Sequence, residues 1–416
     1  MNNTPSANRL HIAFFGKRNT GKSSLVNAIT GQNLAIVSEQ KGTTTDPVFK
    51  AMELLPLGPV VIIDTPGIDD EGMLGELRVE KAQQVLNKTD IAVLVVETKL
   101  SDMEMELVGI FKDKKIPYIV AINKSDLTTI NDPGVLETWR EKFGEVISVS
   151  AKTGHNIQQL KEKIAAHANT EENPLQIVGD LIKAGDIVVL VTPIDKAAPK
   201  GRLILPQQQT IRDILDTNAA AIVVKETQYS NTLANLKKDP ALVITDSQVF
   251  DLVSAETPEY INLTSFSILF ARQKGFLDAA VKSIKAIDSI EDRDKILICE
   301  GCTHHRQCDD IGTVKLPRWI NEYSGKSPEF VFCSGGDFPK DLTPYKLILH
   351  CGACMLNNRE IKYRRDSAAV QDIPFTNYGV AIAHIKGILK RSLEVFSNKN
   401  NDSEKYSNKN TNPPKT

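Results

Sequence analysis

An eight-residue loop near the start of the chain constrains the fold more than any other feature. It is Gly16-Lys17-Arg18-Asn19-Thr20-Gly21-Lys22-Ser23, which has the spacing GxxxxGK[ST]. The apolar run Leu10–Phe15 precedes it, and the helical pattern Ser24–Ile29 follows it. In that context the glycines let backbone N–H groups surround phosphates at the N-terminus of a helix, while Lys22 reaches the β- and γ-phosphates and the Ser23 hydroxyl can ligate Mg²⁺. The loop therefore predicts a strand, a phosphate-binding turn and a helix, in that order.

Short apolar runs alternate with amphipathic stretches of helical length along most of the chain. The predicted strands are Leu10–Phe15, Val60–Ile63, Ile91–Val96, Ile116–Ile122, Val146–Val149, Asp186–Val191, Ala221–Val224, Ala241–Ile244, Lys295–Ile298, Glu329–Phe332 and Tyr345–Leu349. A long helix is expected from about Ser265 to Ile290. This rhythm is typical of α/β domains with mostly parallel sheets.

At 416 residues the chain exceeds what one core usually supports. We expect a P-loop domain over residues 1–168, followed by two smaller α/β domains over 175–262 and 263–396. Residues 397–416 contain almost nothing apolar, which predicts a disordered tail.

The composition excludes several classes of protein. An apolar fraction of 41% with 25% charged residues is ordinary for a globular protein, and a formal charge of −2 gives no reason to expect nucleic-acid or membrane binding. No apolar run approaches the roughly 18 to 20 residues that a membrane span needs. The first residues lack a basic leader followed by a long apolar region, so we expect a cytoplasmic protein.

Four further segments identify the nucleotide. Asp64-Thr65-Pro66-Gly67 follows a predicted strand, with Asp64 placed near Mg²⁺ and the Gly67 amide near the γ-phosphate. Asn123-Lys124-Ser125-Asp126 supplies a carboxylate that accepts from guanine N1 and N2, a donor pair that adenine lacks. Ser150-Ala151-Lys152 directs the Ala151 amide at guanine O6, and Thr44 of the GTTTD segment 42–46 is the expected mobile Mg²⁺ ligand.

These segments together predict a GTPase. The expected catalytic residues are Lys22, Thr44 and Gly67, and the expected Mg²⁺ ligands are Ser23, Thr44 and Asp64. The nucleotide-binding set is Gly16, Asn19, Gly21, Lys22, Ser23, Ser24, Thr44, Asp64, Gly67, Asn123, Lys124, Asp126, Ser150, Ala151 and Lys152.

Two residues bear on how the attacking water is held. Ile68 stands where Ras-type enzymes carry the glutamine that orients water, so the water must be positioned differently. Asn19, with GTTTD downstream, resembles the TrmE–Era branch of GTPases, whose members with this asparagine can use K⁺ where others use an arginine finger. That resemblance implies K⁺-stimulated hydrolysis with Asn19 at the K⁺ site.

Every cysteine of the chain lies between Cys299 and Cys354, which is a density that core packing does not need. Three predicted strands end at Cys299, at Cys333 and at the pair His350-Cys351. If these strands are parallel, the three cysteines emerge together at the carboxyl edge of one sheet, where ligands of open α/β sheets usually bind.

The spacing alone leaves the metal open. Cys299-x₂-Cys302 with Cys351-x₂-Cys354 could form a tetrahedral zinc site, while Cys302, Cys351 and Cys354 could hold a [4Fe–4S] cluster with one iron left for His304, His350, solvent or a partner. Cys299 fits the role of a buried small apolar residue as well as that of a metal ligand. For Cys308 and Cys333, a purely structural role is favoured over a role as a metal ligand.

The combination of motifs resembles HydF, the family of [FeFe]-hydrogenase maturation GTPases. The resemblance rests on a TrmE–Era-like GTPase segment together with Cys302-Thr303-His304 and, 45 residues later, His350-Cys351-Gly352-Ala353-Cys354. It implies three cluster cysteines, 302, 351 and 354, with His304 and His350 beside the cluster. Cys299, Cys308 and Cys333 fall outside the family's motif, which favours the cluster over the zinc site.

The resemblance also implies a function and partners. The protein would be a scaffold or carrier that holds a [4Fe–4S] cluster and a transient precursor of the hydrogenase two-iron subcluster, and delivers the precursor to apo-[FeFe]-hydrogenase (HydA). The radical-SAM maturases HydE and HydG would act upstream, and residues 175–262 would form a homodimer or a higher assembly. The alternatives are a regulatory GTPase with a structural zinc or redox-sensing cluster, and a tRNA-modifying enzyme of the TrmE kind, whose C-terminal cysteine motif is absent here.

Overall fold

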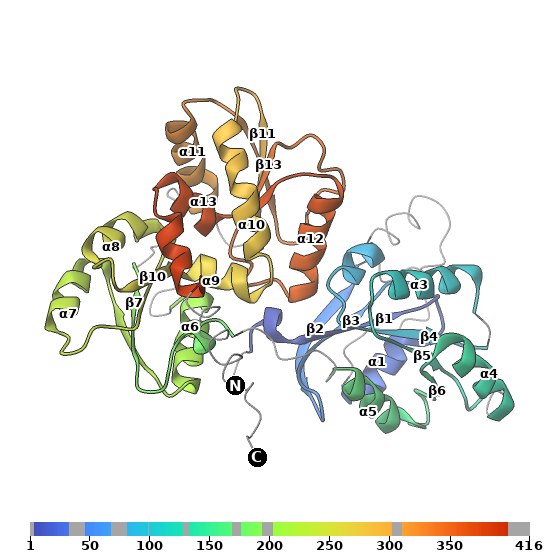
Figure 1. Ribbon diagram of the computed structural model, residues 1–416. Helices are drawn as coiled ribbons and strands as arrows, with labels where there is room; N and C mark the ends of the chain where they lie inside the picture. Colours follow the sequence, from blue (N-terminus) through green and yellow to red (C-terminus); the bar gives the residue numbers. More distant parts are fainter. Residues whose placement is uncertain are drawn as a thin grey trace, which may run out of the picture. The chain divides into compact units, whose positions relative to one another are not determined.

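The computed structural model of the protein (Figure 1) describes residues 4–32, 46–67, 81–98, 100–127, 133–168, 176–193, 203–301 and 310–397. The predicted site residues Thr44, Cys302 and His304 lie outside these ranges. The chain divides into two compact units, residues 1–173 with the segment 357–360, and the remaining residues from 174 onward. Each unit is built around parallel strands.

The first unit contains a six-stranded sheet of order β2-β3-β1-β4-β5-β6, in which β2 pairs with β3 antiparallel and the other pairs are parallel. Its strands are β1 (Leu10–Phe15), β2 (Val48–Leu54), β3 (Gly58–Asp64), β4 (Ile91–Val96), β5 (Tyr118–Ile122) and β6 (Val146–Ser148). Its helices are α1 (Lys22–Thr30), α3 (Asp102–Asp113), α4 (Pro133–Phe143) and α5 (Ile157–Ala168).

Both faces of this sheet are buried, which explains why its central strands are apolar without interruption. Because successive residues of a strand point to opposite faces, Phe15 of β1 packs in one core with Phe111 of α3. Its neighbour Phe14 packs in a second core with Leu25 of α1 and Leu160 of α5. The sheet is therefore held between helices on its two faces, as the βα rhythm predicts.

The second unit contains two four-stranded parallel sheets, of order β10-β9-β7-β8 and β12-β11-β13-β14. Its strands are β7 (Ile187–Val191), β8 (Ala220–Val224), β9 (Leu242–Thr245), β10 (Asn262–Ser265), β11 (Lys295–Glu300), β12 (Glu329–Ser334), β13 (Leu347–His350) and β14 (Phe375–Asn377). Its helices are α6 (Leu205–Asp216), α7 (Tyr229–Asn235), α8 (Phe250–Glu256), α9 (Phe266–Gln273), α10 (Leu277–Ser283), α11 (Leu316–Ser324), α12 (Asn358–Val370) from Ile361 onward, and α13 (Tyr378–Ile385).

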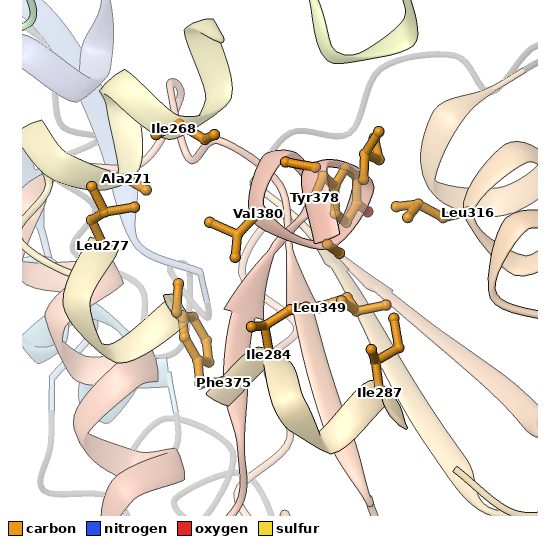
Figure 2. Packing of buried hydrophobic residues seen from close by; sticks show 14 of the residues in the cluster. Ile268, Ala271, Leu277, Ile284, Ile287, Leu316, Leu349, Phe375, Tyr378 and Val380 are labelled. Atoms are coloured by element: carbon orange, nitrogen blue, oxygen red, sulfur yellow. The ribbon is translucent and has the colours of Figure 1, made fainter. Parts of the chain in front are cut away.

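One continuous apolar core joins the two sheets of the second unit. It contains Val243 of β9 as well as Leu349 of β13 and Phe375 of β14. Figure 2 shows side chains of the surrounding helices, among them Val380 of α13 and Leu277 of α10, gathered around Phe375 and Leu349. The predicted fold class, a P-loop domain followed by α/β structure with parallel sheets, is confirmed.

The prediction of one long helix from Ser265 to Ile290 is wrong. The chain forms α9 and α10 there, followed by a 3₁₀ segment over Ile284–Ser289. Gly275 lies between the two helices with φ of 74°, a left-handed conformation that ends a helix and that glycine adopts without steric cost. The apolar periodicity continues across the break because both helices pack on the same core.

No helix in the described ranges is long and apolar enough to cross a membrane.

Candidate functional site

The turn between β1 and α1 accepts only glycine at two positions. Gly16 has φ of 142°, and a Cβ atom there would lie 2.2 Å from the Val95 carbonyl oxygen. Gly21 has φ of 82°, and a Cβ atom there would lie 2.3 Å from Nδ2 of Asn123. The two glycines thus let the loop approach both β4 and the Asn123 side chain, so backbone N–H groups rather than side chains can line the turn.

Lys22 and Ser23 stand at the start of α1, next to the end of β3. Nζ of Lys22 donates to the carbonyl oxygens of Gly16 at 2.9 Å and Lys17 at 2.5 Å, so the ammonium group lies inside the loop. The Ser23 hydroxyl donates to Oδ2 of Asp64 at 2.6 Å.

The Asp64 carboxylate is suited to ligate Mg²⁺ or to bind a water molecule that ligates it. Its Oδ1 is buried without a hydrogen-bond partner, so one carboxylate oxygen is left for a cation or its water. Burial raises the pKa of Asp64, while the Ser23 hydrogen bond and the Lys22 charge act in the opposite direction. A buried carboxylate beside a serine hydroxyl is the donor chemistry that Mg²⁺ prefers.

Asn123 connects the phosphate loop to the far end of the site. Its Nδ2 donates to the Thr20 carbonyl oxygen at 2.9 Å, and its Oδ1 accepts from the Ala151 amide at 3.1 Å. Lys124 adds a second link, because its Nζ donates to the Asn19 carbonyl oxygen at 2.6 Å. The loop, the segment after β5 and the segment after β6 are therefore fixed relative to one another, although they are far apart in the sequence.

Asp126 is held as an exposed carboxylate at the end of this arrangement. The Ser150 hydroxyl donates to its Oδ1 at 2.7 Å, and that hydrogen bond lowers the pKa of Asp126. The same Ser150 oxygen accepts from the Thr153 amide at 3.2 Å, which fixes the loop that carries Ala151 and Lys152. An ionised carboxylate that only accepts hydrogen bonds suits a base with two neighbouring donors, which is guanine.

A second arrangement of polar groups lies at the carboxyl edge of the sheet β12-β11-β13-β14. Cys299 of β11 is in register with Cys333 of β12 on one side and with His350 of β13 on the other. The predicted convergence of these three strand ends is confirmed. The chain leaves β11 toward β12 and later continues from β13 to β14, so the strand order reverses between β11 and β13, where open α/β sheets bind their ligands.

Cys351 lies directly after β13 at this reversal point. Its Sγ accepts from the Gly301 amide at 3.1 Å and from the Ala353 amide at 3.4 Å. Burial raises the pKa of Cys351, and the two amides act in the opposite direction. Backbone N–H groups directed at a cysteine sulfur are the environment that tunes iron–sulfur ligands.

His350 is buried beneath this loop with both ring nitrogens engaged. Its Nδ1 lies 2.9 Å from the Cys351 carbonyl oxygen, and its Nε2 lies 3.1 Å from Nη1 of Arg364. Burial lowers its pKa to about 3, and the Arg364 charge acts in the same direction, so the ring is neutral. Ligation of iron by His350 would require the ring to give up its contact with either Arg364 or the Cys351 carbonyl oxygen.

Arg364 is a functional candidate that the sequence did not indicate. It belongs to α12 and is fully buried, and besides His350 it contacts the Gly335 carbonyl oxygen and the ring of Phe338, whose centroid is 5.2 Å from its Cζ. Lys274 was missed as well; its Nζ donates at 2.9 Å to the carbonyl oxygen of Leu356, two residues after Cys354. Neither residue belongs to a motif, so no local signal could have found it.

Within the described ranges, no group of three or more His, Cys, Asp and Glu side chains is arranged to hold a metal ion. Of the five predicted cluster residues, Cys351, Cys354 and His350 are described.

Comparison with known protein families shows which family the chain belongs to. Residues 177–275 match the hydrogen maturase F dimerization domain, and residues 278–395 match the hydrogen maturase F tetramerization domain. Residues 11–124 match the 50S ribosome-binding GTPase family. The chain belongs to the hydrogen maturase F family. The two maturase domains lie end to end over more than half of the chain and contain every described residue of the cysteine-bearing edge.

The GTPase part of this hydrogen maturase F chain has many relatives. It is 34% identical over 165 residues to GTPase Der of Wolinella succinogenes, covering 37% of this chain and 35% of that protein. It is 33% identical to tRNA modification GTPase MnmE of Desulforamulus reducens, covering 37% and 34%. GTPase Era of Clostridium acetobutylicum is 32% identical, covering 41% and 59%. The chain thus spans less than two thirds of the length of these relatives.

Among solved structures, a single-substitution variant of Aquifex aeolicus Era bound to GDP and AlF₄⁻ is 22% identical, covers 52% of this chain and 92% of that chain, and has a TM-score of 0.36.

Proposed function

We propose that this maturase hydrolyses GTP and carries an iron–sulfur cluster from which the two-iron subcluster precursor of [FeFe]-hydrogenase is delivered. The observation that carries the proposal is the Cys351 sulfur, held by two backbone amides at the strand-reversal point of a hydrogen maturase F domain. The GTPase domain of the same chain supplies a nucleotide-controlled switch, since a loop that senses the γ-phosphate can change how a partner binds.

GTP would lie along the loop 16–23, with its base at Asp126 and Ala151. The loop amides and Lys22 would hold the phosphates, and Ser23, Asp64 and Thr44 would hold Mg²⁺. The magnesium ion supplies charge neutralisation at the transferring phosphate when bound. The Gly67 amide would meet the γ-phosphate. Because Ile68 offers no polar group, water is positioned by other residues.

The cluster ligands would be Cys302, Cys351 and Cys354, leaving one iron with an exchangeable position. An iron–sulfur cluster supplies such a position when only three thiolates hold it. His304 is a candidate beside that iron, whereas we propose that His350 chiefly orients the Cys351 loop, since its Nδ1 contacts the Cys351 carbonyl oxygen and its Nε2 contacts Arg364.

The remaining assignments are also proposals. The dimerization and tetramerization matches support a homodimer or a higher assembly. The functional division would be a GTPase part at 1–168, a dimerisation part at 175–262 and a cluster-binding part at 263–396. The upstream partners would be HydE and HydG, and the acceptor would be apo-hydrogenase (HydA), all acting in the cytoplasm.

The deciding experiment is anaerobic. The full chain is reconstituted with iron and sulfide, its iron and zinc are counted, its EPR spectrum is recorded, and the loaded protein is mixed with apo-hydrogenase after incubation with the upstream maturases. Hydrogen evolution is the expected result. A colourless zinc protein would favour a regulatory GTPase with a structural metal, and a clustered protein that never activates the hydrogenase would favour a redox-sensing one.

We expect Cys351→Ala to lose the cluster while Cys333→Ala retains it. Removing one of three thiolates leaves two ligands, too few to hold a four-iron cluster against chelation, whereas Cys333 is outside the ligand set. Iron per chain after desalting and the EPR signal of the reduced protein are the measurements. Cys302→Ala and Cys354→Ala should behave as Cys351→Ala does. Equal iron retention in the Cys351 and Cys333 variants would contradict the assignment.

We expect GTP hydrolysis to be about tenfold faster in KCl than in NaCl, and the difference to disappear in Asn19→Ala. A monovalent cation near the phosphates stabilises transition-state charge, and a tenfold effect corresponds to about 1.4 kcal/mol. Asn19 is suited to a K⁺ site because the loop has a defined conformation there. Its φ is 59°, and Lys124 donates a hydrogen bond to its carbonyl oxygen. Phosphate release at matched ionic strength is the measurement. Equal rates in both salts for both proteins would rule out K⁺ stimulation.

A further inference from the structure

Two cysteines outside the cluster motif lie side by side at the sheet edge. Cys299 of β11 and Cys333 of β12 are in-register partners, and their Sγ atoms are 3.0 Å apart. Both belong to the described residues, and neither forms a disulfide in this structure. Sequence reasoning favoured a small apolar residue for Cys333 and left Cys299 open between that role and a zinc ligand.

The backbone at this pair is compatible with a disulfide. Neighbouring strands lie about 4.7 to 4.9 Å apart, within the roughly 4.4 to 6.8 Å between Cα atoms that a disulfide spans. The sulfur separation exceeds the S–S bond length of about 2.05 Å by about 1 Å, so side-chain rotation and a small strand movement suffice to close it.

The two thiols differ in how accessible they are. Cys299 is fully buried, whereas Cys333 retains 8% of its exposure, so Cys333 is the thiol that a reagent reaches first. Because the two sulfur atoms are 3.0 Å apart, a reagent bound to Cys333 lies within reach of the Cys299 sulfur.

We propose that Cys299 and Cys333 form a redox-active dithiol that a low-molecular-weight disulfide such as oxidised glutathione converts to an intramolecular disulfide. The Cys333 thiolate attacks the reagent, forming a mixed disulfide and releasing one reduced thiol. Cys299, deprotonated as it attacks Sγ of Cys333, then expels the second thiol. The pair loses two electrons and two protons, and the reagent gains both.

The pair is adjacent to the predicted cluster loop but shares no ligand with it. The Cys299 carbonyl oxygen accepts from the Cys351 amide at 2.9 Å, and Gly301, two residues further on, donates to the Cys351 sulfur. A disulfide would therefore tie β11 to β12 at the point where β11 supports Cys351. The inference does not rest on the proposed carrier function, because it needs no metal.

The test uses the full chain with Cys302, Cys308, Cys351 and Cys354 replaced by Ala, so that only the pair remains. The protein is equilibrated anaerobically over a series of glutathione redox ratios, quenched in acid, unfolded and alkylated. We expect one cooperative conversion from two alkylated thiols to none, with the loss of the mass of two hydrogen atoms. In the matched variants that also carry Cys299→Ala or Cys333→Ala, the remaining thiol should form only a mixed disulfide or stay free.

The wild-type chain provides an independent measurement in case the four-alanine variant fails to fold. Metal-free wild-type protein is oxidised in the same buffers and digested without reduction, and we expect a cross-linked peptide that joins Cys299 to Cys333. Two alkylated thiols at every redox ratio, or wild-type cross-links that consistently join other cysteines, would overturn the proposal.

Discussion

Replacing Asp126 by asparagine should weaken GTP binding by about 100-fold or more and, at the same time, improve binding of xanthosine triphosphate. The carboxylate accepts two hydrogen bonds from guanine in the proposed site, and a site built for such bonds strongly rejects a mismatched partner. An asparagine amide replaces one acceptor by a donor. Xanthine carries a carbonyl oxygen where guanine carries its amino group, so it can accept from that donor.

We expect Asp126→Asn to alter only the contacts with the nucleotide base, because the Asp126 side chain takes no part in the hydrogen bonds that hold the phosphate loop. That side chain contacts Ser150, whereas the loop is tied through Asn123 and Lys124. Phosphate and Mg²⁺ contacts should therefore persist, and the variant should remain folded.

The measurement is titration calorimetry with the magnesium complexes of GTP and xanthosine triphosphate. Asp113→Asn is the matched control, since Asp113 is an exposed aspartate at the end of α3, outside every nucleotide-binding segment, and it should bind GTP as the parent does. If Asp126→Asn bound both nucleotides like the parent, Asp126 would not contact the base, and the guanine assignment would fail.

Replacing Arg364 by methionine should lower the free energy of unfolding of the second unit by about 2 to 5 kcal/mol. Methionine approximates the length of the arginine side chain but cannot donate. Nε2 of His350, which is buried, and the carbonyl oxygen of Gly335, which is partly buried, would each lose the guanidinium. A buried acceptor left without its donor costs about 1 to 3 kcal/mol, and the packing of Arg364 against Phe338 would change as well.

The chain offers both a probe and a control for this measurement. It has two tryptophans, and Trp319 in α11 lies in the second unit, so urea unfolding can be followed by its fluorescence in a Trp139→Phe background. Arg365→Met is the control, because Arg365 is partly exposed and pairs with Asp366 at 2.6 Å, a contact worth about 1 kcal/mol or less. Equal losses in the two variants would show that the buried guanidinium contributes no more than a surface one.

The sequence determined much of the first unit. The predicted strands Leu10–Phe15 and Ile91–Val96 agree with β1 and β4 residue for residue. The loop begins directly after β1 as predicted, but α1 starts at Lys22, two residues before the predicted helical pattern, so Lys22 and Ser23 belong to the first turn of the helix. Strand periodicity and turn chemistry are local properties, and a single sequence records them directly.

The same local signals located the cysteine-bearing edge. Three apolar runs ended in cysteine or histidine, and parallel strands bring such ends together. The signals failed between α9 and α10. Both helices pack on a common core with one periodicity, and the only break is the three-residue connection 274–276, where Gly275 is left-handed.

Tertiary structure alone decided which polar groups are buried at that edge. Arg364 belongs to the charged segment Asn358-Arg359-Glu360-Ile361-Lys362-Tyr363-Arg364-Arg365, whose composition is typical of a solvated helix. Its burial depends on where α12 meets the sheet, since that contact places its guanidinium against His350 and the chain after β12. The closeness of Cys299 and Cys333 likewise follows from strand order and register. These are long-range properties, fixed by how elements pack and not by the residues within any one of them.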